Sequence, residues 1–218
     1  KSNVLSYEGP FGVGYMIAEL MPGSRDLSRD LYSFIENKHK TEIDVIRKAE
    51  DPYVALARKS LEYYIKKGRV LEVPDYLPAE MTDQKKGVFV SIKKYGQLRG
   101  CIGTISPVTG SVAEEIIQNA VSAGTRDPRF NPVKEHELKD LVYSVDVLEE
   151  PEPIDSIDQL DVKRYGVIVT SGYKRGLLLP DLESIETPSQ QVEIALSKAG
   201  ISKGEKYSLE RFEVIRHR

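Results

Sequence analysis

The sequence has no tryptophan, a single cysteine, three methionines and three histidines among its 218 residues. A lone cysteine forms no disulfide within the chain, and a metal site would need ligands of other types. No apolar run approaches the roughly 18 residues that a membrane-spanning helix needs. We therefore expect no membrane span, no bound metal and no other cofactor, and a reducing cytoplasm as the compartment.

An excess of charge of one sign is also missing. The formal net charge is −3 and the isoelectric point is about 5.8, so the whole-chain charge gives no argument for nucleic-acid binding. Hydrophobic residues make up 40% and charged residues 30%, a composition typical of globular proteins. The chain begins at Lys1 rather than at Met, and we expect a processed or truncated piece of a longer protein.

Helical and strand patterns alternate along the chain. Helix-capping residues and closing glycines predict helices over residues 51–68, 111–124 and 187–200. Residues 87–94 alternate as a strand, and 97–105 would return antiparallel after a turn at Tyr95-Gly96. Further strands are expected over residues 141–148, 165–171, 174–179 and 207–215. This mixture indicates an α+β fold rather than a doubly wound sheet.

Three other segments carry weaker patterns. Residues 7–15 are rich in glycine and aromatics, which is typical of a strand and turn, and Gly12-Val13-Gly14 lacks the third glycine of a phosphate loop. Residues 22–50 predict a short helix followed by a charged connector. The acidic run over residues 146–161 is expected to be a solvated loop.

The cysteine lies in a glycine-flanked segment over residues 98–104, Leu-Arg-Gly-Cys-Ile-Gly-Thr. Strand alternation predicts that Arg99 and Cys101 share one face with Gly103, and that the other four residues share the opposite face. Glycines at positions 100 and 103 either leave the backbone open to a ligand or mark a bulge or tight helix packing. The thiol is accordingly either reactive or a small packed hydrophobe.

Basic residues and one turn lie close to this segment in the sequence. Residues 85–99 contain five basic side chains and no acidic one, which predicts either an anion-binding strand pair or a lysine-guarded edge. The turn Asp127-Pro128-Arg129-Phe130 places an acid and a base on a rigid loop, or is simply a turn pinned by a buried Phe130. We expect His136 and His217 to be solvated surface residues.

These residues carry a family resemblance. The segment 98–103, preceded by Gly87-Val88-Phe89-Val90, closely resembles the signature of the AMMECR-type domain family. Further matching segments follow in order over roughly residues 47–218: Ala55-Leu56-Ala57-Arg58, Asp127-Pro128-Arg129-Phe130, Ser144-Val145-Asp146-Val147-Leu148, Leu179-Pro180 and Lys198-Ala199-Gly200. The missing tryptophan is a departure, because relatives often carry tryptophan around the last helix.

The first residues resemble another family. The stretch 7–15 is similar to the tail of a Memo-like domain, a relative of class III extradiol dioxygenases that is fused to an AMMECR-type domain in some prokaryotes. The resemblance implies a Memo-like remnant at 1–20, a linker or short helix at 21–46 and the AMMECR-type domain at 47–218. It implies an α+β fold, mainly antiparallel, with about three to four helices, a larger and a smaller subdomain, and a groove near the cysteine. A fused or separate Memo-like domain and a radical S-adenosylmethionine protein are the implied partners.

Three hypotheses for function follow. In a cysteine-dependent enzyme acting on a small anionic substrate, Cys101 is nucleophile or acid/base, Arg99 holds the anion, and Asp127 or Arg129 orients the substrate. The residues that would contact the ligand are Gly100, Gly103, Thr104 and Arg129. The alternatives are a non-catalytic module that binds an anion, a nucleotide or nucleic acid, and a protein–protein adaptor.

Overall fold

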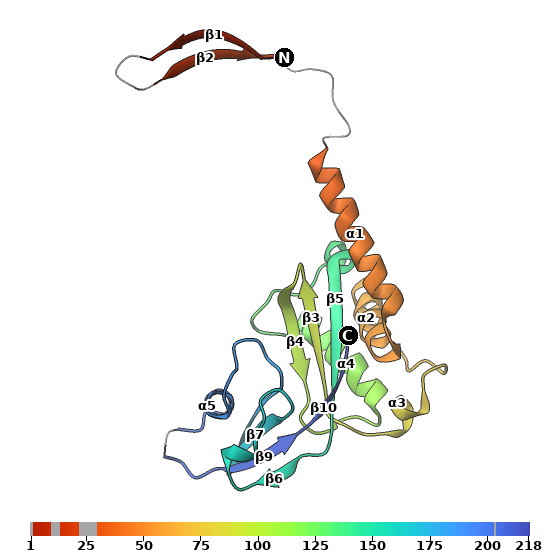
Figure 1. The fold of residues 1–218 in the computed structure, drawn as a ribbon. Coiled ribbons are helices and arrows are strands. Elements are labelled where there is room, and N and C mark those ends of the chain that lie inside the picture. Colours follow the sequence, from red (N-terminus) through yellow and green to blue (C-terminus); the bar gives the residue numbers. More distant parts are fainter. Residues whose placement is uncertain (1, 10–13, 22–29, 203) are drawn as a thin grey trace. The chain divides into compact units, whose positions relative to one another are not determined.

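A computed structural model describes residues 2–9, 14–21, 30–202 and 204–218 (Figure 1). Contacts divide the chain into two units, Lys1–His39 and Lys40–Arg218. The first unit contains an antiparallel hairpin of β1 (Ser2–Glu8) and β2 (Tyr15–Leu20), whose described side chains are exposed on both strands. The double-glycine segment at 12–14 lies largely outside the described residues.

Helix α1 (Leu31–Ala49) replaces the expected short helix and charged connector. It continues for 19 residues, and only Ile43 is buried on it. This expectation was wrong because residues 36–42 are all polar, so the sequence shows no hydrophobic stripe that continues through the middle of the helix.

The second unit is built on two four-stranded antiparallel sheets, which confirms the α+β class. The first sheet has the order β10-β5-β3-β4, with bounds Val214–His217, Leu141–Leu148, Val88–Lys94 and Gln97–Gly103. The second has the order β6-β9-β7-β8, with bounds Glu152–Ile154, Ser208–Phe212, Gly166–Ser171 and Lys174–Leu178. The larger and smaller subdomains therefore each have a sheet of their own.

The last expected strand is in fact two strands. The chain leaves β9 at Phe212, passes Glu213 and enters β10 at Val214, so it crosses from the second sheet to the first. The acidic run is likewise not one solvated loop. It contains the end of β5, β6 and the short helix η4 (Ile157–Gln159), and Asp146 is buried beside Arg216.

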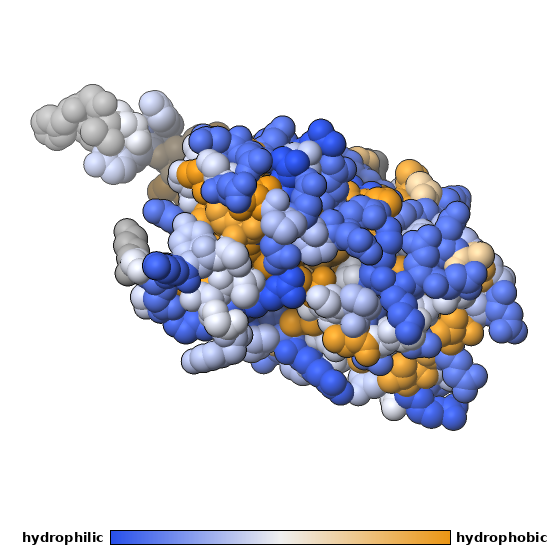
Figure 2. Space-filling view, turned by 90° about the horizontal axis from the view of Figure 1, so that it is seen from below, coloured by the Kyte–Doolittle hydropathy of each residue, from blue (hydrophilic) through white to orange (hydrophobic). Residues whose placement is uncertain are grey.

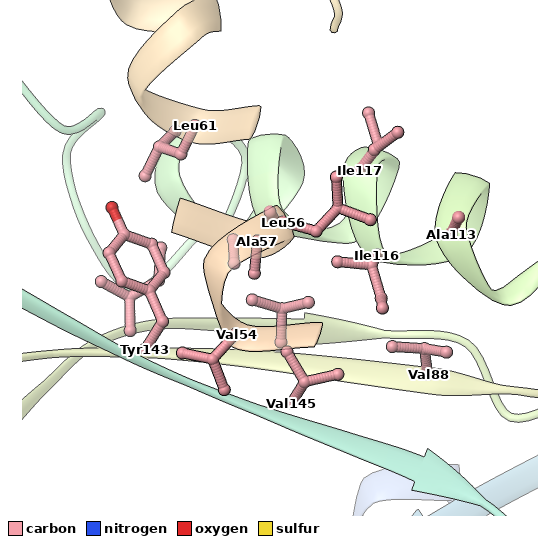
Figure 3. Close-up of a cluster of buried hydrophobic side chains, with 14 of the residues drawn as sticks. Val54, Leu56, Ala57, Leu61, Val88, Ala113, Ile116, Ile117, Tyr143 and Val145 are labelled. Carbon is pink, nitrogen blue, oxygen red and sulfur yellow. The ribbon is translucent and has the colours of Figure 1, made fainter. Parts of the chain in front are cut away.

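Helices α2 (Pro52–Lys67) and α4 (Val112–Thr125) pack on one face of the first sheet (Figure 1). The alternating residues Val88, Val90 and Ile92 of β3 are fully buried beneath them. Figure 3 shows the side chains of both helices meeting those of the sheet in one apolar cluster. The remaining helices are α3 (Ala79–Asp83), η3 (Glu135–Asp140) and α5 (Pro188–Ala199), of which α5 packs on β7 and β8.

Local sequence accounts for the helix ends. Asp51 caps α2 by accepting hydrogen bonds from the backbone N–H groups of Tyr53 and Val54, both at 3.0 Å. Gly68 and Gly200 end α2 and α5 in the left-handed conformation, with φ of 68° and 67°. These caps confirm the expected boundaries because they depend on neighbouring residues alone.

Gly124 does not end its helix, contrary to expectation. Helix α4 continues to Thr125, and a Cβ at Gly124 would lie 2.5 Å from the Leu61 side chain of α2. Glycine is present here because the two helices approach closely. Gly100 has the same role between α4 and β4, since a Cβ there would lie 2.1 Å from the carbonyl oxygen of Ala123.

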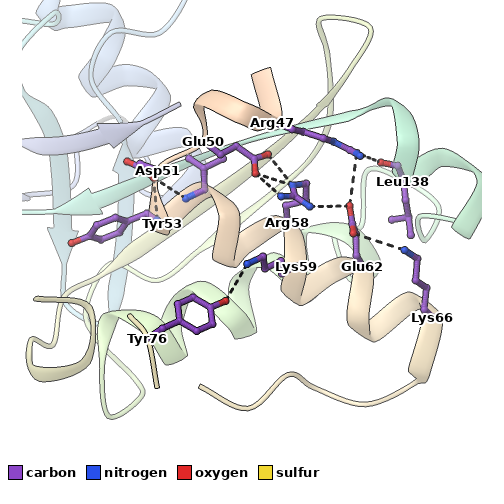
Figure 4. Close-up of polar contacts among 11 residues, drawn as sticks. Arg47, Glu50, Asp51, Tyr53, Arg58, Lys59, Glu62, Lys66, Tyr76 and Leu138 are labelled. Carbon is purple, nitrogen blue, oxygen red and sulfur yellow. Dashed lines mark hydrogen bonds and ion pairs between the residues drawn. The ribbon is translucent and has the colours of Figure 1, made fainter. Parts of the chain in front are cut away.

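A network of charged residues ties α1 to α2 within the second unit (Figure 4). Arg58 donates to both carboxylate oxygens of Glu50 at 2.9 and 2.8 Å, and Glu62 lies between Arg47 and Arg58. Arg47 also donates to the carbonyl oxygen of Leu138 at 2.7 Å. The end of α1 is thereby held to the sheet's helical layer.

Hydrophilic residues cover most of the face seen in Figure 2, and hydrophobic residues interrupt it in several separate areas. Among the residues that the structure describes, no helix combines the length and the apolar character needed to cross a membrane.

The contact at Gly100 gives a direct test of the fold. Gly100→Ala places a methyl group against a helix carbonyl that cannot move independently, so we expect the free energy of unfolding to fall by about 3 kcal/mol or more. Urea unfolding followed by circular dichroism measures the change. The exposed Gln97→Ala in the same strand is the matched control and should stay within about 0.5 kcal/mol of the parent. Equal midpoints for the two variants would contradict the contact.

Candidate functional site

The candidate site lies on the edge strand β4, whose alternation is broken by a bulge. Gly100 lies opposite Ile92, but Leu98 lies opposite Lys93, so Arg99 has no partner in the register. Leu98 therefore shares the face of Cys101, and Arg99 turns to Glu137 of η3 instead, with contacts of 3.2 and 3.0 Å. The expected common face for Arg99 and Cys101 is wrong because one extra residue shifts the alternation.

At both glycines of the segment, neighbouring atoms already occupy the space that a side chain would need. Gly100 is buried against α4, and a Cβ at Gly103 would lie 2.2 Å from the ring of Phe89 in the neighbouring strand. The prediction that both positions are open to a ligand is therefore wrong. The alternative explanation, tight helix packing, is correct for Gly100, because α4 packs directly on it.

Thr104 faces the helical layer. Its hydroxyl donates to Glu115 at 2.7 Å, and Glu115 also accepts the backbone N–H of Thr109 at 2.7 Å. Glu115 is fully buried, and Asn119 lies beside it. The hydroxyl of Thr104 thus belongs to a structural network that holds the end of β4 and the following loop.

Asp127 and Arg129 complete the outer edge of β4 at Cys101. The backbone N–H of Cys101 donates to Asp127 Oδ2 at 2.9 Å, and Arg129 Nη2 donates to the Cys101 carbonyl oxygen at 3.3 Å. Edge strands leave such groups unpaired unless something covers them. The loop after α4 therefore occupies the place of a further strand. The Asp127 carboxylate accepts the hydrogen bond that a neighbouring carbonyl would accept, and the Arg129 guanidinium donates the one that a neighbouring N–H would donate.

Asp127 also fixes Arg129. Two N–H groups of the guanidinium, on Nε and Nη2, donate to the two carboxylate oxygens at 3.0 and 2.8 Å. These bonds, with the one from Cys101, hold the pKa of Asp127 at about 2 against the opposing effect of burial. The side chain of Arg129 is 55% exposed, and the described part of the chain gives its Nη1 no partner. A positive group is thus presented rigidly to solvent beside the cysteine.

The thiol of Cys101 lies on the sheet face opposite the helices and is partly buried. The hydroxyl of Ser91, directly across on β3, is 3.2 Å from the sulfur. Burial and the charge of Asp146 raise the pKa of the thiol, while Ser91 and the nearby charges of Arg129 and Lys198 act to lower it. The net direction is upward, so the neutral thiol is the resting form at neutral pH.

Lys198 reaches this site from α5 in the other subdomain. The residue is exposed, and its pKa is lowered, first by partial desolvation and also by the charge of Arg129, while Cys101 acts in the opposite direction. Cys101, Arg129 and Lys198 thus come from three segments that are distant in sequence. The Lys198-Ala199-Gly200 segment belongs to the family resemblance, but no role for Lys198 is predicted from it, because no pattern in the neighbouring sequence links α5 to β4.

Three of the five basic side chains in the run at 85–99 are paired with acids from elsewhere in the chain, whereas Lys85 and Lys93 are exposed. Lys86 pairs with Glu149 at 2.7 Å, and Lys94 joins Arg99 on Glu137. The hydrogen bonds from Arg99 and Lys94 hold the pKa of Glu137 at about 2, and Arg99 has the larger effect. They argue against a continuous anion-binding surface on this strand pair.

The histidines take no part in the site. His136 is exposed in η3, as expected. His217 is instead stacked on the ring of Tyr53, with centroids 3.8 Å apart, and its Nδ1 contacts Asp51. Within the described ranges, no group of three or more potential ligands (His, Cys, Asp or Glu) gathers as a metal site.

The buried carboxylate predicts a pH-dependent contribution to stability. A folded-state pKa of about 2 against an ordinary 3.8 stabilises the fold above pH 4, by about 2 kcal/mol, and this contribution is lost as pH falls toward 2. Asp127→Asn should therefore lower the free energy of unfolding at pH 7, and the gap to the parent should close between about pH 4 and 2.

Urea unfolding at a series of pH values measures that gap, with the exposed Asp155→Asn as the control for a simple loss of charge. A gap that stays constant down to pH 2 would show that Asp127 contributes through shape rather than through its ionisation.

Comparisons with known proteins agree with these features. The AMMECR1 family model matches residues 54–217. A protein of Clostridium acetobutylicum is 52% identical over 219 positions, which cover all of this chain and 46% of that protein, so the chain spans about half of its length. A Thermotoga maritima protein is 46% identical over 171 positions, 78% of this chain and 98% of its own.

The crystal structure of an uncharacterized protein from Pyrococcus horikoshii is similar in fold. It superposes with a TM-score of 0.69 at 33% identity, covering 75% of this chain and 88% of that chain. The names of these three relatives assign no activity.

Proposed function

The chain belongs to the AMMECR1 family, and from this premise and the geometry around Cys101 we propose that it binds a small anionic molecule there. Arg129 and Lys198 are its charge partners, and the β4 backbone with the Cys101 thiol forms the surface beneath it. Asp127 is a positioning residue, since both of its oxygens are already committed to Arg129 and to Cys101 N–H.

The observation that carries this proposal is the fixed guanidinium of Arg129. An arginine that is already held through Nε and Nη2 loses little conformational freedom when its Nη1 donates a hydrogen bond to an anion. The ammonium of Lys198 supplies a second cation, whose charge acts on the Cys101 thiol together with that of Arg129. Carboxylates and phosphates are the anions that such donors bind best.

A cysteine-dependent reaction on the bound anion is the second candidate. Ser91 and the two cations favour the thiolate, but burial, together with the Asp146 carboxylate, outweighs them and raises the pKa of Cys101. Catalysis would therefore require the ligand, or a change on binding, to activate the thiol. Arg99, proposed from the sequence as the anion holder, is the weaker candidate because Glu137 occupies it.

The lone cysteine provides its own probe of local charge. Iodoacetate is anionic and iodoacetamide is neutral, so the ratio of their alkylation rates reports the electrostatic attraction at Cys101 while the thiolate fraction cancels. We expect this ratio to exceed that of a free thiol peptide, and to fall about threefold in Arg129→Gln and in Lys198→Gln. Mass spectrometry of the single-cysteine protein measures both rates.

Lys174→Gln, which removes a lysine paired with Glu205, is the matched control and should leave the ratio unchanged. Added salt should lower the ratio in the parent protein. A ratio equal to that of the free peptide would contradict the anion site. A rate that is already at its plateau by pH 8 would favour the cysteine-dependent enzyme, because it requires a thiol pKa lower than the buried site provides.

We further propose that β1 and β2 belong to a Memo-like domain, as the sequence resemblance implies. Large hydrophobic side chains are exposed along both strands, among them Val4, Tyr7, Met16 and Ile17. A two-stranded hairpin is marginally stable unless something covers it. The Clostridium relative has more than half of its length outside the match, enough for a further domain. A radical S-adenosylmethionine protein stays a proposed partner on the resemblance alone.

Hydrogen exchange tests the proposal for the hairpin. In the 218-residue chain, the amides of Val4 and Ile17 should exchange almost as fast as in an unstructured peptide, whereas those of Val90 and Val145 in the first sheet stay protected. In the longer Clostridium protein the equivalent hairpin should be protected. Slow exchange of the hairpin in the 218-residue chain would show that it needs no covering domain.

A further inference from the structure

A second group of basic side chains lies where β10 meets the segments before β7 and after β8. A hollow of about 360 Å³ is lined there by four basic side chains and one acidic side chain, together with Pro180 and Val214. The basic residues are Lys163, Arg164, Arg216 and Arg218, and the acidic one is Asp181. Cavities of this size hold small ligands.

Arg216 is the fixed member of this group. Its Nε and Nη2 donate to buried Asp146 at 2.6 and 3.3 Å, and Nη2 also donates to the carbonyl oxygen of Pro180 at 3.2 Å. Its side chain is only 20% exposed. The remaining Nη1 points to Asp181 at 3.7 Å, which is beyond hydrogen-bond distance. The guanidinium is therefore held in place with one edge directed at the hollow.

Asp181 is shared by three cations, of which only Lys163 is within hydrogen-bond distance. Lys163 is 3.3 Å from its carboxylate, Arg216 is 3.7 Å away and Arg218 is 3.9 Å away. The residue has φ of 52°, the left-handed region, and its N–H donates to the carbonyl oxygen of Val162 at 2.8 Å. One carboxylate on a constrained backbone cannot satisfy donors that approach from several sides.

We infer that this hollow is a binding site for a phosphate group, with Asp181 as an internal competitor for the same cations. A phosphate has three terminal oxygens and a charge near −2, so it can accept from Lys163, Arg216 and Arg218 together, where a carboxylate has only two oxygens. Arg164 is less available, because Glu213 pairs with it at 2.7 Å. The site does not share its cations with Arg129 and Lys198 beside Cys101.

The test uses the complete 218-residue chain and inorganic phosphate as the probe. Titration at constant ionic strength, followed by amide nuclear magnetic resonance, should shift the signals of Lys163 and Asp181. Lys163→Gln should weaken phosphate binding at these signals about threefold, because it removes one cation. Asp181→Asn should strengthen it by a similar factor, and asparagine tolerates the left-handed backbone, so the fold is kept.

Controls separate this site from general electrostatics and from the proposed cysteine site. Lys174→Gln and Asp155→Asn change the charge equally outside the hollow and should leave the phosphate affinity at Asp181 unchanged. Arg129→Gln should also leave it unchanged, whatever it does to signals near Cys101. The inference is overturned if Asp181→Asn fails to strengthen binding, if Lys174→Gln weakens it as much as Lys163→Gln, or if acetate binds as tightly as phosphate.

Discussion

The carboxylate of Asp127 is the interaction on which the candidate site depends. It accepts the outward N–H of Cys101, which an edge strand would otherwise leave unpaired, and it orients Arg129 over the same residue. Its partners hold its pKa at about 2, so it is fully ionised wherever the protein functions at neutral pH. One buried acid thus closes the edge of the sheet and presents a cation to solvent. Structure and site share this group and cannot be altered separately.

The glycines around the cysteine are also explained by structure rather than by ligand binding. Gly100 allows α4 to approach the strand, and Gly103 makes room for the ring of Phe89. Both therefore serve packing, and glycines on either side of a cysteine do not by themselves mark a place for a ligand. The chemically distinctive groups are the charged ones that converge from elsewhere, Arg129 from the loop after α4 and Lys198 from α5.

The two subdomains contribute differently to the proposed anion sites. The first provides a rigid sheet with its helices on one face, and the other face carries Cys101 and Asp146. The chain returns to that sheet through β10 only after building the second one, so Arg216 reaches Asp146 across 70 residues of sequence. Basic side chains thus approach this sheet from different parts of the fold, with Arg129 in the loop after α4, Arg216 on β10 and Lys198 on α5 of the second subdomain. This arrangement underlies both proposed anion sites.

The sequence by itself determined the elements whose causes are local. The caps at Asp51 and Thr187, the terminal glycines at 68 and 200 and the alternation of β3 all rest on neighbouring residues, and each is present in the structure. Tertiary structure decided the rest. A one-residue bulge moved Arg99 away from Cys101, packing made Gly124 part of a helix, and Lys198 arrived from a distant helix. Register and long-range approach depend on the whole fold, so no local pattern can specify them.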